Sequence, residues 1–115
     1  MTIERRDGVA VASLVDEFEI STANAVRSQL LDSISNRDHG LVIDLQNVSF
    51  MDSAGINTLF ELAERLGSRQ QTVAVVLPER AVVRRVAELV GLGSSVSVCE
   101  TVDEAVEGIP AADSE

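Results

Sequence analysis

Two short runs typical of extended backbone lie at the start of the chain, TIERR at residues 2–6 and the mostly apolar VAVASL at residues 9–14, one on each side of Asp7-Gly8. An Asp-Gly pair between such runs is typical of a tight β-hairpin turn, because both residues accept positive backbone φ angles. The pattern therefore predicts strands at residues 2–6 and 9–14 that pair with each other in a hairpin.

An amphipathic helix is predicted next, where apolar residues recur at spacings of three and four: Ala23, Val26, Leu30 and Ile34. Ser21 or Thr22 is its expected N-cap, since a hydroxyl oxygen there can accept from a free helical N–H. A dense apolar run at residues 41–45 then predicts a strand that is covered on both faces and therefore central in a sheet.

A second helix is predicted at residues 54–66, with an apolar face made of Ile56, Leu59, Phe60, Ala63 and Leu66. Glu61 and Arg65 form an i,i+4 pair on its exposed side, and Gly67 is expected to cap its C-terminus. The apolar run at residues 72–77 predicts another buried strand.

A third helix is predicted at residues 79–90, where three apolar residues at helical spacing are expected to face inward: Val82, Val86 and Leu89. Gly91 is expected to end this helix. The alternating run at residues 95–99 predicts a short strand.

The last predicted helix, at residues 101–109, begins with a capping box in which Thr101 and Glu104 satisfy each other's free backbone N–H groups. The order β-β-α-β-α-β-α-β-α indicates an α/β fold with a mixed, mostly parallel sheet of about five strands and about four helices. We expect one domain at residues 1–109 and a short polar, disordered tail at 110–115.

Composition and charge narrow the range of partners. The chain of 115 residues has a formal net charge of -10, which disfavours binding to nucleic acid or to an anionic membrane, where Lys and Arg must meet phosphate. The N-terminus is charged, and no window approaches the roughly 18 apolar residues of a membrane span. We therefore expect a cytoplasmic protein that binds another protein or a small molecule and does not insert into a membrane.

The single cysteine, Cys99, has no partner for an internal disulfide, and no Cys/His cluster has metal-ligand spacing. The sequence also lacks a glycine-rich phosphate loop, so neither a metal nor another cofactor is predicted. Cys99 is interpreted as a half-buried strand residue, and the alternative is an intermolecular redox switch.

The stretch SFMDSAG, residues 49–55, follows the predicted central strand, and functional residues of α/β folds gather at such strand ends. Asp52 or Ser53 could simply cap the next helix. A nucleophilic Ser53 would need a base, but the only histidine, His39, lies in a polar loop before the strand and is expected to be solvated. We therefore do not expect an enzyme.

A third interpretation makes Ser53 a phosphoacceptor. A phosphate adds about -1.5 to -2 units of charge, and a helix N-terminus tolerates an anion through its free N–H groups. A partner docked over that helix end would then meet repulsion and the cost of desolvating the phosphate.

The run LVIDLQNVSFMDSAGINTLFELAERL resembles the signature of the bacterial anti-sigma factor antagonist family, the STAS-domain proteins: a buried strand, a D-S-[ST/A]-G turn and a helix. DEFEISTA upstream and RRVAELVGLGSSVSVCETVDEAV downstream are also similar to that family, so the resemblance covers nearly the whole chain. It implies a single STAS-type domain that acts by binding a protein.

The resemblance further implies that Ser53 is phosphorylated by the cognate anti-sigma factor, itself a serine kinase, and dephosphorylated by a serine phosphatase. The unphosphorylated form would bind the anti-sigma factor and release a sigma factor. Asp52, Ala54 and Gly55 match the turn motif. Two residues depart from the family pattern, Asp16 and Asn57, each at a position where the family often has glycine.

The expected docking surface consists of Thr22, Ala23, Asn57, Thr58 and Glu61. Two rival hypotheses remain at this stage. The chain could be a STAS subunit of another assembly, such as a lipid transporter or a stress-sensing complex, that has no phosphoswitch. It could instead be a small enzyme or ligand-binding protein that uses the same strand-end crevice.

Overall fold

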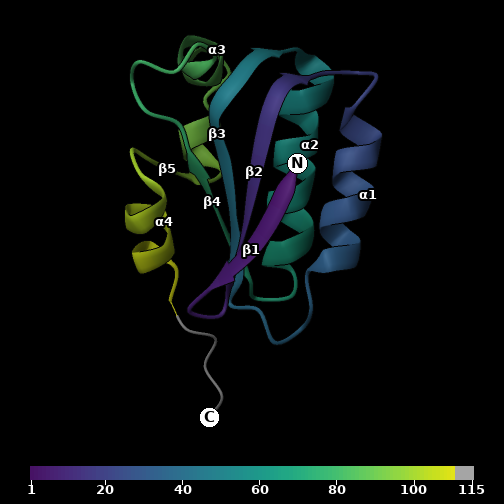
Figure 1. Cartoon of the computed structure of the whole chain (residues 1–115), viewed down its shortest axis with the longest axis vertical. Helices are drawn as coiled ribbons and strands as arrows, with labels where there is room; N and C mark the ends of the chain where they lie inside the picture. Colours follow the sequence, from purple (N-terminus) through teal and green to yellow (C-terminus); the bar gives the residue numbers. More distant parts are fainter. Residues whose placement is uncertain (111–115) are drawn as a thin grey trace.

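The computed structural model describes residues 1–110 (Figure 1). In chain order its elements are β1 (Thr2–Arg6), β2 (Val9–Phe18), α1 (Ala23–Ser33), β3 (Gly40–Met51), α2 (Ser53–Gly67), β4 (Thr72–Val76), α3 (Arg84–Leu89), the short 3-10 helix η1 (Leu92–Ser94), β5 (Ser97–Cys99) and α4 (Val102–Gly108). The tail predicted at 110–115 lies outside the described residues, apart from Pro110.

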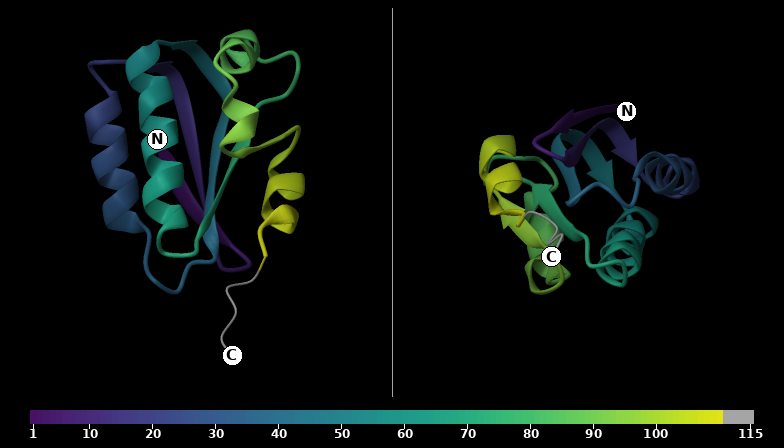
Figure 2. Two further views of the ribbon diagram at one scale, coloured as in Figure 1. Left: turned by 180° about the vertical axis from the view of Figure 1, so that it is seen from behind. Right: turned by 90° about the horizontal axis from the view of Figure 1, so that it is seen from below.

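The described strands form one sheet in the order β1-β2-β3-β4-β5. β1 runs antiparallel to β2, and every other neighbouring pair is parallel. Figures 1 and 2 show α1 and α2 on one face of the sheet and α4 on the other. The predicted α/β class, N-terminal hairpin and central strand are confirmed.

The central strand β3 supplies side chains to two hydrophobic cores. Five of its residues lie in the larger core beneath α1 and α2: Leu41, Ile43, Leu45, Val48 and Met51. Val42 points to the other face, where it belongs to a smaller core with Ala105 and Val106 of α4. Burial on both faces explains why this segment is a dense apolar run, interrupted only by Asp44, rather than an alternating one.

The hairpin turn has the geometry that its sequence predicts. Asp7 and Gly8 have φ angles of 54° and 80°, and Arg6 pairs with Val9 across the turn. The ring of His39 packs against this turn, 2.6 Å from where a Cβ on Gly8 would lie. The expectation of a solvated His39 was therefore wrong, because the side chain is half-buried against the hairpin.

The strands β2 and β3 are longer than predicted and continue together past β4. The β3–β4 pairing ends at Asp44 and Val76, whereas β2 and β3 remain paired as far as Phe18 and Met51. Two register shifts interrupt this extension, and Asp16 within it has a φ of 63°. The irregularities break the alternation of polar and apolar residues, which is why the pattern predicted shorter strands.

Of the two helix ends predicted to be closed by glycine, that of α2 differs from its prediction and that of α3 agrees. Gly67 is the last residue of α2, but the C-cap is Ser68 in a right-handed conformation, and the positive φ angle, 63°, falls on Gln70. Gly91, with a φ of 70°, lies just beyond α3 as expected, since its N–H donates to the Glu88 carbonyl oxygen.

Helix α3 is shorter than predicted and faces the core with other residues. Val83 and Ala87 are buried, whereas Val82 and Leu89 are 72% and 73% exposed and Val86 is only partly buried. The prediction of an inward-facing side chain was wrong for Val82 and Leu89, whereas Val86 packs against the core as predicted. The segment has two apolar stripes, and periodicity cannot decide between them.

The predicted capping box of α4 forms only in part. Thr101 Oγ1 accepts a hydrogen bond of 3.0 Å from the Glu104 N–H. The Glu104 carboxylate accepts at 2.8 Å from the N–H of Glu100 rather than from that of Thr101.

In the part of the chain that is described, no helix combines the length and the apolar character that crossing a membrane requires.

Candidate functional site

Asp52 lies between the end of β3 and the start of α2, at the carboxyl end of the central strand. Its Oδ1 accepts hydrogen bonds from the N–H groups of Ala54 and Gly55, at 2.9 and 3.1 Å. Asp52 has an extended backbone, as an N-cap requires. The structure thereby decides between the two predicted caps, because Asp52 caps the helix and Ser53 is its first residue.

The second oxygen of Asp52 connects this helix start to the loop between β2 and α1. Oδ2 accepts a hydrogen bond of 3.2 Å from the Ile20 N–H. Thr22 stabilises the same loop, because its Oγ1 accepts a hydrogen bond of 3.0 Å from the Glu19 N–H. Thr22 stands at the N-cap position of α1, but its side chain does not cap that helix.

Gly55 is required by close packing rather than by backbone conformation. A Cβ at this position would lie 2.3 Å from the Phe18 carbonyl oxygen and 3.0 Å from Cγ of Met51. Backbone oxygen cannot move aside cheaply at that distance. The glycine therefore lets the first turn of α2 lie directly on the end of β2, which places Ser53 beside the β2–α1 loop.

Ser53 is exposed at this helix start, while His39, the only histidine that could have served as its base, lies at the opposite end of β3. His39 precedes the strand and Ser53 follows it, so a rise of about 3.3 Å per residue separates them by roughly 35–40 Å. The Ser-His pair that nucleophilic catalysis would need is not assembled. Among residues 1–110, no three His, Cys, Asp or Glu side chains gather as metal ligands.

Only some of the residues expected on the docking surface reach solvent. Asn57 is exposed, and Thr22 and Glu61 are half-buried. Ala23 and Thr58 are each only 4% exposed. The expectation that these two contact a partner was wrong, because both side chains point into the protein.

The side chains of Thr58 and Glu61 already have intramolecular partners. Thr58 Oγ1 donates a hydrogen bond of 2.9 Å to the Ala54 carbonyl oxygen, one turn earlier in α2. Glu61 contacts Arg27 of α1 at 3.2 Å and Arg65 of α2 at 3.5 Å. Glu61 therefore joins the two helices and offers a partner only part of its carboxylate.

Three large apolar side chains at the Ser53 end of the sheet are exposed and were not predicted: Val15 at 52%, Ile20 at 76% and Phe50 at 50%. Phe50 stands one residue before the buried Met51, and Ile20 precedes the helix-start residues Ser21 and Thr22. Their exposure follows from the extension of β2 and β3 beyond the rest of the sheet. The sequence held a signal for this exposure, because all three residues lie outside the predicted strands and helices and so had no predicted buried face.

The Ser53 end of the sheet also carries acidic side chains near the exposed apolar ones. Asp16, Glu17 and Glu19 lie along the end of β2 and the following loop, and Asp16 and Glu17 are exposed. No arginine occurs in residues 7–26 or 38–64, which supply both strand ends and the start of α2. We call the set of Val15, Ile20 and Phe50 with these three acids the acidic apolar surface.

Cys99 lies half-buried in the edge strand β5, as predicted. Burial, and then the nearby charge of Glu104, raise the pKa of the Cys99 thiol. A raised pKa reduces the fraction of reactive thiolate. The structure gives no support to the redox interpretation, which remains an untested alternative.

Comparisons with known proteins show the family and the fold of this chain. The family model of the STAS domain matches residues 1–105. The chain is 30% identical over 109 residues to the anti-sigma-F factor antagonist RsfB of Mycobacterium tuberculosis, covering 95% of this chain and 88% of that protein. The crystal structure of an anti-sigma factor antagonist from Mycobacterium paratuberculosis is 31% identical, with a TM-score of 0.82 and coverage of 94% and 91%.

The fold is also shared with the Bacillus cell fate determinant SpoIIAA in its phosphorylated form. The TM-score is 0.69 at 20% sequence identity, with coverage of 95% of this chain and 98% of that chain. At this level of identity the similarity concerns the fold alone.

Proposed function

We propose that this chain, which belongs to the STAS domain family, is an anti-sigma factor antagonist that phosphorylation of Ser53 switches off. Its similarity to RsfB and to the mycobacterial antagonist structure supports the general role of an antagonist. The partner is an anti-sigma factor that is also a serine kinase, and a serine phosphatase restores the binding form. Binding of the unphosphorylated chain to the anti-sigma factor releases a sigma factor.

One observation carries the proposal: Asp52 supplies the N-cap of α2, so the helix does not need the hydroxyl of Ser53. Asp52 Oδ1 satisfies two of the free N–H groups at the helix start, and Ser53 is exposed beside it. A kinase can therefore modify Ser53 without removing a cap. The fold should survive phosphorylation, which a reversible switch requires.

Phosphorylation would change the surface more than the fold. The phosphate brings about -1.5 to -2 units of charge to an end of the molecule that already carries Asp16, Glu17 and Glu19. The helix N-terminus offsets part of this charge within the protein. A partner that must desolvate the phosphate receives no such compensation, so its affinity falls.

The acidic apolar surface is the part of the chain that fits such a partner. Val15, Ile20 and Phe50 provide exposed apolar side chains, and the three acids provide negative charge that complements a basic protein surface. We therefore assign partner contact to the acidic apolar surface and remove the buried Ala23 and Thr58 from the docking surface. Thr22, Asn57 and Glu61 remain at its margin.

The proposal is tested by incubating the protein with ATP and candidate anti-sigma factors of the serine-kinase type, followed by intact-protein mass spectrometry. One added phosphate is expected on the wild-type chain and on Ser49→Ala, a control at a neighbouring exposed serine, and none on Ser53→Ala. Ser53→Ala should bind the anti-sigma factor constitutively, and Ser53→Asp or Ser53→Glu should bind it at least tenfold more weakly.

Equal affinities of the three Ser53 variants would refute the phosphoswitch. Stable binding to an anti-sigma factor without any phosphate transfer would leave an antagonist that has lost its switch. A stable complex with transporter or stress-complex components, and none with an anti-sigma factor, would favour the rival assembly-subunit hypothesis.

A further inference from the structure

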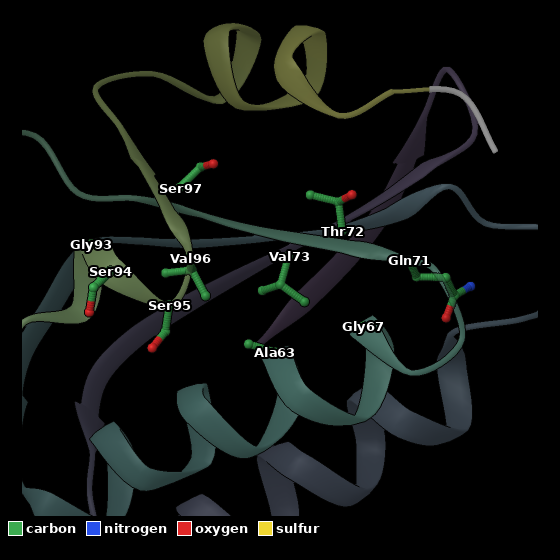
Figure 3. A pocket seen from close by; sticks show the side chains of 10 residues that line it. All are labelled: Ala63, Gly67, Gln71, Thr72, Val73, Gly93, Ser94, Ser95, Val96 and Ser97. Atoms are coloured by element: carbon green, nitrogen blue, oxygen red, sulfur yellow. The ribbon is translucent and has the colours of Figure 1, made fainter. Parts of the chain in front are cut away.

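A hollow of about 420 Å³ between α2 and the segment formed by η1 and β5 offers a partner little apolar area (Figure 3). Val73 and Val96 point into it, but each is only 6% exposed. Within residues 1–110, the exposed large apolar side chains belong instead to two other sets. One is part of the acidic apolar surface, and the second lies on and beside α3: Val82, Leu89 and Val90.

The second set has an arginine in its middle. Val82, Arg85 and Leu89 are spaced by three and four positions, which places them on one side of a helix. The hydrogen-bonded turns already begin before α3, because the Arg84 N–H donates to the Ala81 carbonyl oxygen at 3.1 Å. Arg85 is exposed between the two exposed apolar side chains.

The charge on and beside α3 is slightly positive in an otherwise acidic chain. Arg80 and Arg85 are exposed, and within the described residues neither takes part in an ion pair. Arg84 contacts Glu88 at 3.1 Å, and Glu79 is exposed. Three arginines and two glutamates give residues 79–90 a formal charge of +1. We call the following set the basic apolar surface: Val82, Leu89, Val90, Arg80 and Arg85.

The basic apolar surface and the acidic apolar surface lie at the same end of the sheet. Figures 1 and 2 show α3 at the end where β2 stops and α2 starts. Val15 of β2 pairs with Asn47 of β3, and Asn47 lines a small pocket together with Val82. The two surfaces therefore adjoin across the end of β3.

From this arrangement we propose that two copies of this chain form a weak, two-fold symmetric dimer. The acidic apolar surface of each copy binds the basic apolar surface of the other. Because the two surfaces adjoin, one two-fold rotation forms both contacts at once, and the dimer closes instead of growing into a filament.

Charge favours a second copy over other occupants of the basic apolar surface. Asp16 and Glu17 are exposed, and within residues 1–110 neither takes part in an ion pair. They complement Arg80 and Arg85 of the other copy. A basic protein, which is the kind of partner that fits the acidic apolar surface, would be repelled by these arginines.

The available area indicates that the dimer is weak. A large apolar side chain contributes roughly 60–120 Å² when fully exposed, and the six per copy are each partly covered. They provide less than the about 800 Å² per partner of a standard stable interface, so we expect a Kd on the order of 0.1–1 mM. The net charge of -10 on each copy opposes association, but about 0.15 M salt screens charges more than about 8 Å apart.

The dimer covers the surface that we assign to the anti-sigma factor, so the two complexes exclude each other. This consequence rests on the proposed function. Self-association is measured without an anti-sigma factor, so failure of the dimer and failure of the proposed function can be told apart.

Sedimentation equilibrium of the full chain, from about 0.01 to 1 mM in about 0.15 M salt, measures the Kd of the dimer. Leu89→Ser should raise this Kd about tenfold, and Arg85→Glu and Glu17→Arg should each raise it about fivefold. Arg69→Glu is the control, since Arg69 is exposed after the end of α2 and its reversal changes the net charge as much as Arg85→Glu does. It should dimerise like the wild type. All four side chains are exposed, so none of the substitutions should unfold the protein.

A mixture of Arg85→Glu and Glu17→Arg tests which surfaces meet. In each variant alone, both contacts of the dimer bring like charges together. In the mixed dimer one contact is the native one, and the other pairs the two reversed charges. The mixture should therefore associate about as tightly as the wild type.

The proposal is overturned if the mass of the wild type does not rise with concentration, or if Leu89→Ser dimerises as tightly as the wild type. It is also overturned if the mixture associates no more tightly than its two components. If the basic apolar surface binds the anti-sigma factor instead, Leu89→Ser will weaken that complex and leave self-association unchanged, which also contradicts the dimer.

Discussion

The backbone N–H of Ile20 donates a hydrogen bond of 3.2 Å to Oδ2 of Asp52, although the two residues are 32 positions apart in the sequence. The other oxygen of this carboxylate caps α2. One side chain therefore fixes both the start of the helix that carries Ser53 and the position of the exposed Ile20 side chain. The proposed switch and the proposed docking surface share this contact.

Replacing the cap should cost stability, whereas replacing the neighbouring serine should not. Asp52→Ala is expected to lower the free energy of unfolding by about 1 kcal/mol, since two helical N–H groups lose their acceptor. Ser53→Ala should remain within about 0.5 kcal/mol of the wild type. Urea denaturation followed by circular dichroism measures both. If Ser53→Ala were the more destabilising change, Asp52 would not be the residue that caps α2.

The acidic apolar surface should contain the side chains that anchor the partner. Ile20→Ser and Phe50→Ser are expected to weaken binding to the anti-sigma factor about tenfold or more, as truncation of central interface residues does. Leu89→Ser is the control, since Leu89 is 73% exposed against 76% for Ile20 but lies on α3.

Isothermal titration calorimetry measures the affinity of each of the three variants for the anti-sigma factor. None of the substitutions should unfold the protein, because all three side chains are exposed. Loss of affinity in Leu89→Ser with none in Ile20→Ser or Phe50→Ser would move the docking surface to α3. Phosphorylation of Ser53 can be followed separately by mass spectrometry, so a misplaced surface and a missing switch can be told apart.

Asp16 occupies a backbone conformation that suits glycine. Its φ angle of 63° is in the left-handed region, which most residues with a Cβ avoid at a cost of roughly 1–2 kcal/mol. Asp16→Gly should therefore be neutral or slightly stabilising, whereas Asp16→Val should destabilise the protein by about 1–2 kcal/mol. Thermal unfolding of both variants tests this, and an unaffected Asp16→Val would show that the local backbone is not constrained.

Acid should break an ion pair that connects the hairpin to the loop before β3. Arg5 contacts the buried carboxylate of Asp38 through Nε and Nη2, at 3.0 and 2.9 Å, and the Ser35 N–H donates to the same carboxylate at 2.8 Å. Burial by itself would raise the pKa of Asp38, but the Arg5 and Ser35 hydrogen bonds outweigh it and the pKa is lowered. The carboxylate thus stabilises the fold at neutral pH, and this contribution is lost as the pH falls below the ordinary aspartate pKa and through the lowered one.

Arg5→Ala should therefore be less stable than the wild type at neutral pH and should lose less of its stability on acidification, because the ion pair that acid breaks is already absent. At neutral pH the expected cost is about 1–3 kcal/mol. Arg6→Ala is the control, since its partner Asp103 is exposed, and it should leave the acid transition in place. Urea denaturation at neutral and at acidic pH, followed by circular dichroism, measures both proteins. An equal loss of stability on acidification in wild type and Arg5→Ala would show that the Asp38 pair does not contribute to the acid sensitivity.

Local sequence patterns predicted the parts of this protein that local rules control. The Asp7-Gly8 turn, the buried run in β3 and the Asp52 region at the end of that strand were all predicted, because turn chemistry and period report on nearby residues. The same rules were wrong for α3. Its two apolar stripes are equivalent in sequence, and only the surrounding core selects Val83 and Ala87.

The sequence by itself determined the α/β order, the hairpin and the motif that carries Ser53. The tertiary structure alone decided that β2 and β3 extend past β4, that Ile20 and Phe50 are exposed, and that Ala23 and Thr58 are not. The reason is physical: exposure depends on which segments meet in space, and the contacts that settle it, such as Ile20 with Asp52 and Arg5 with Asp38, join residues more than 30 positions apart.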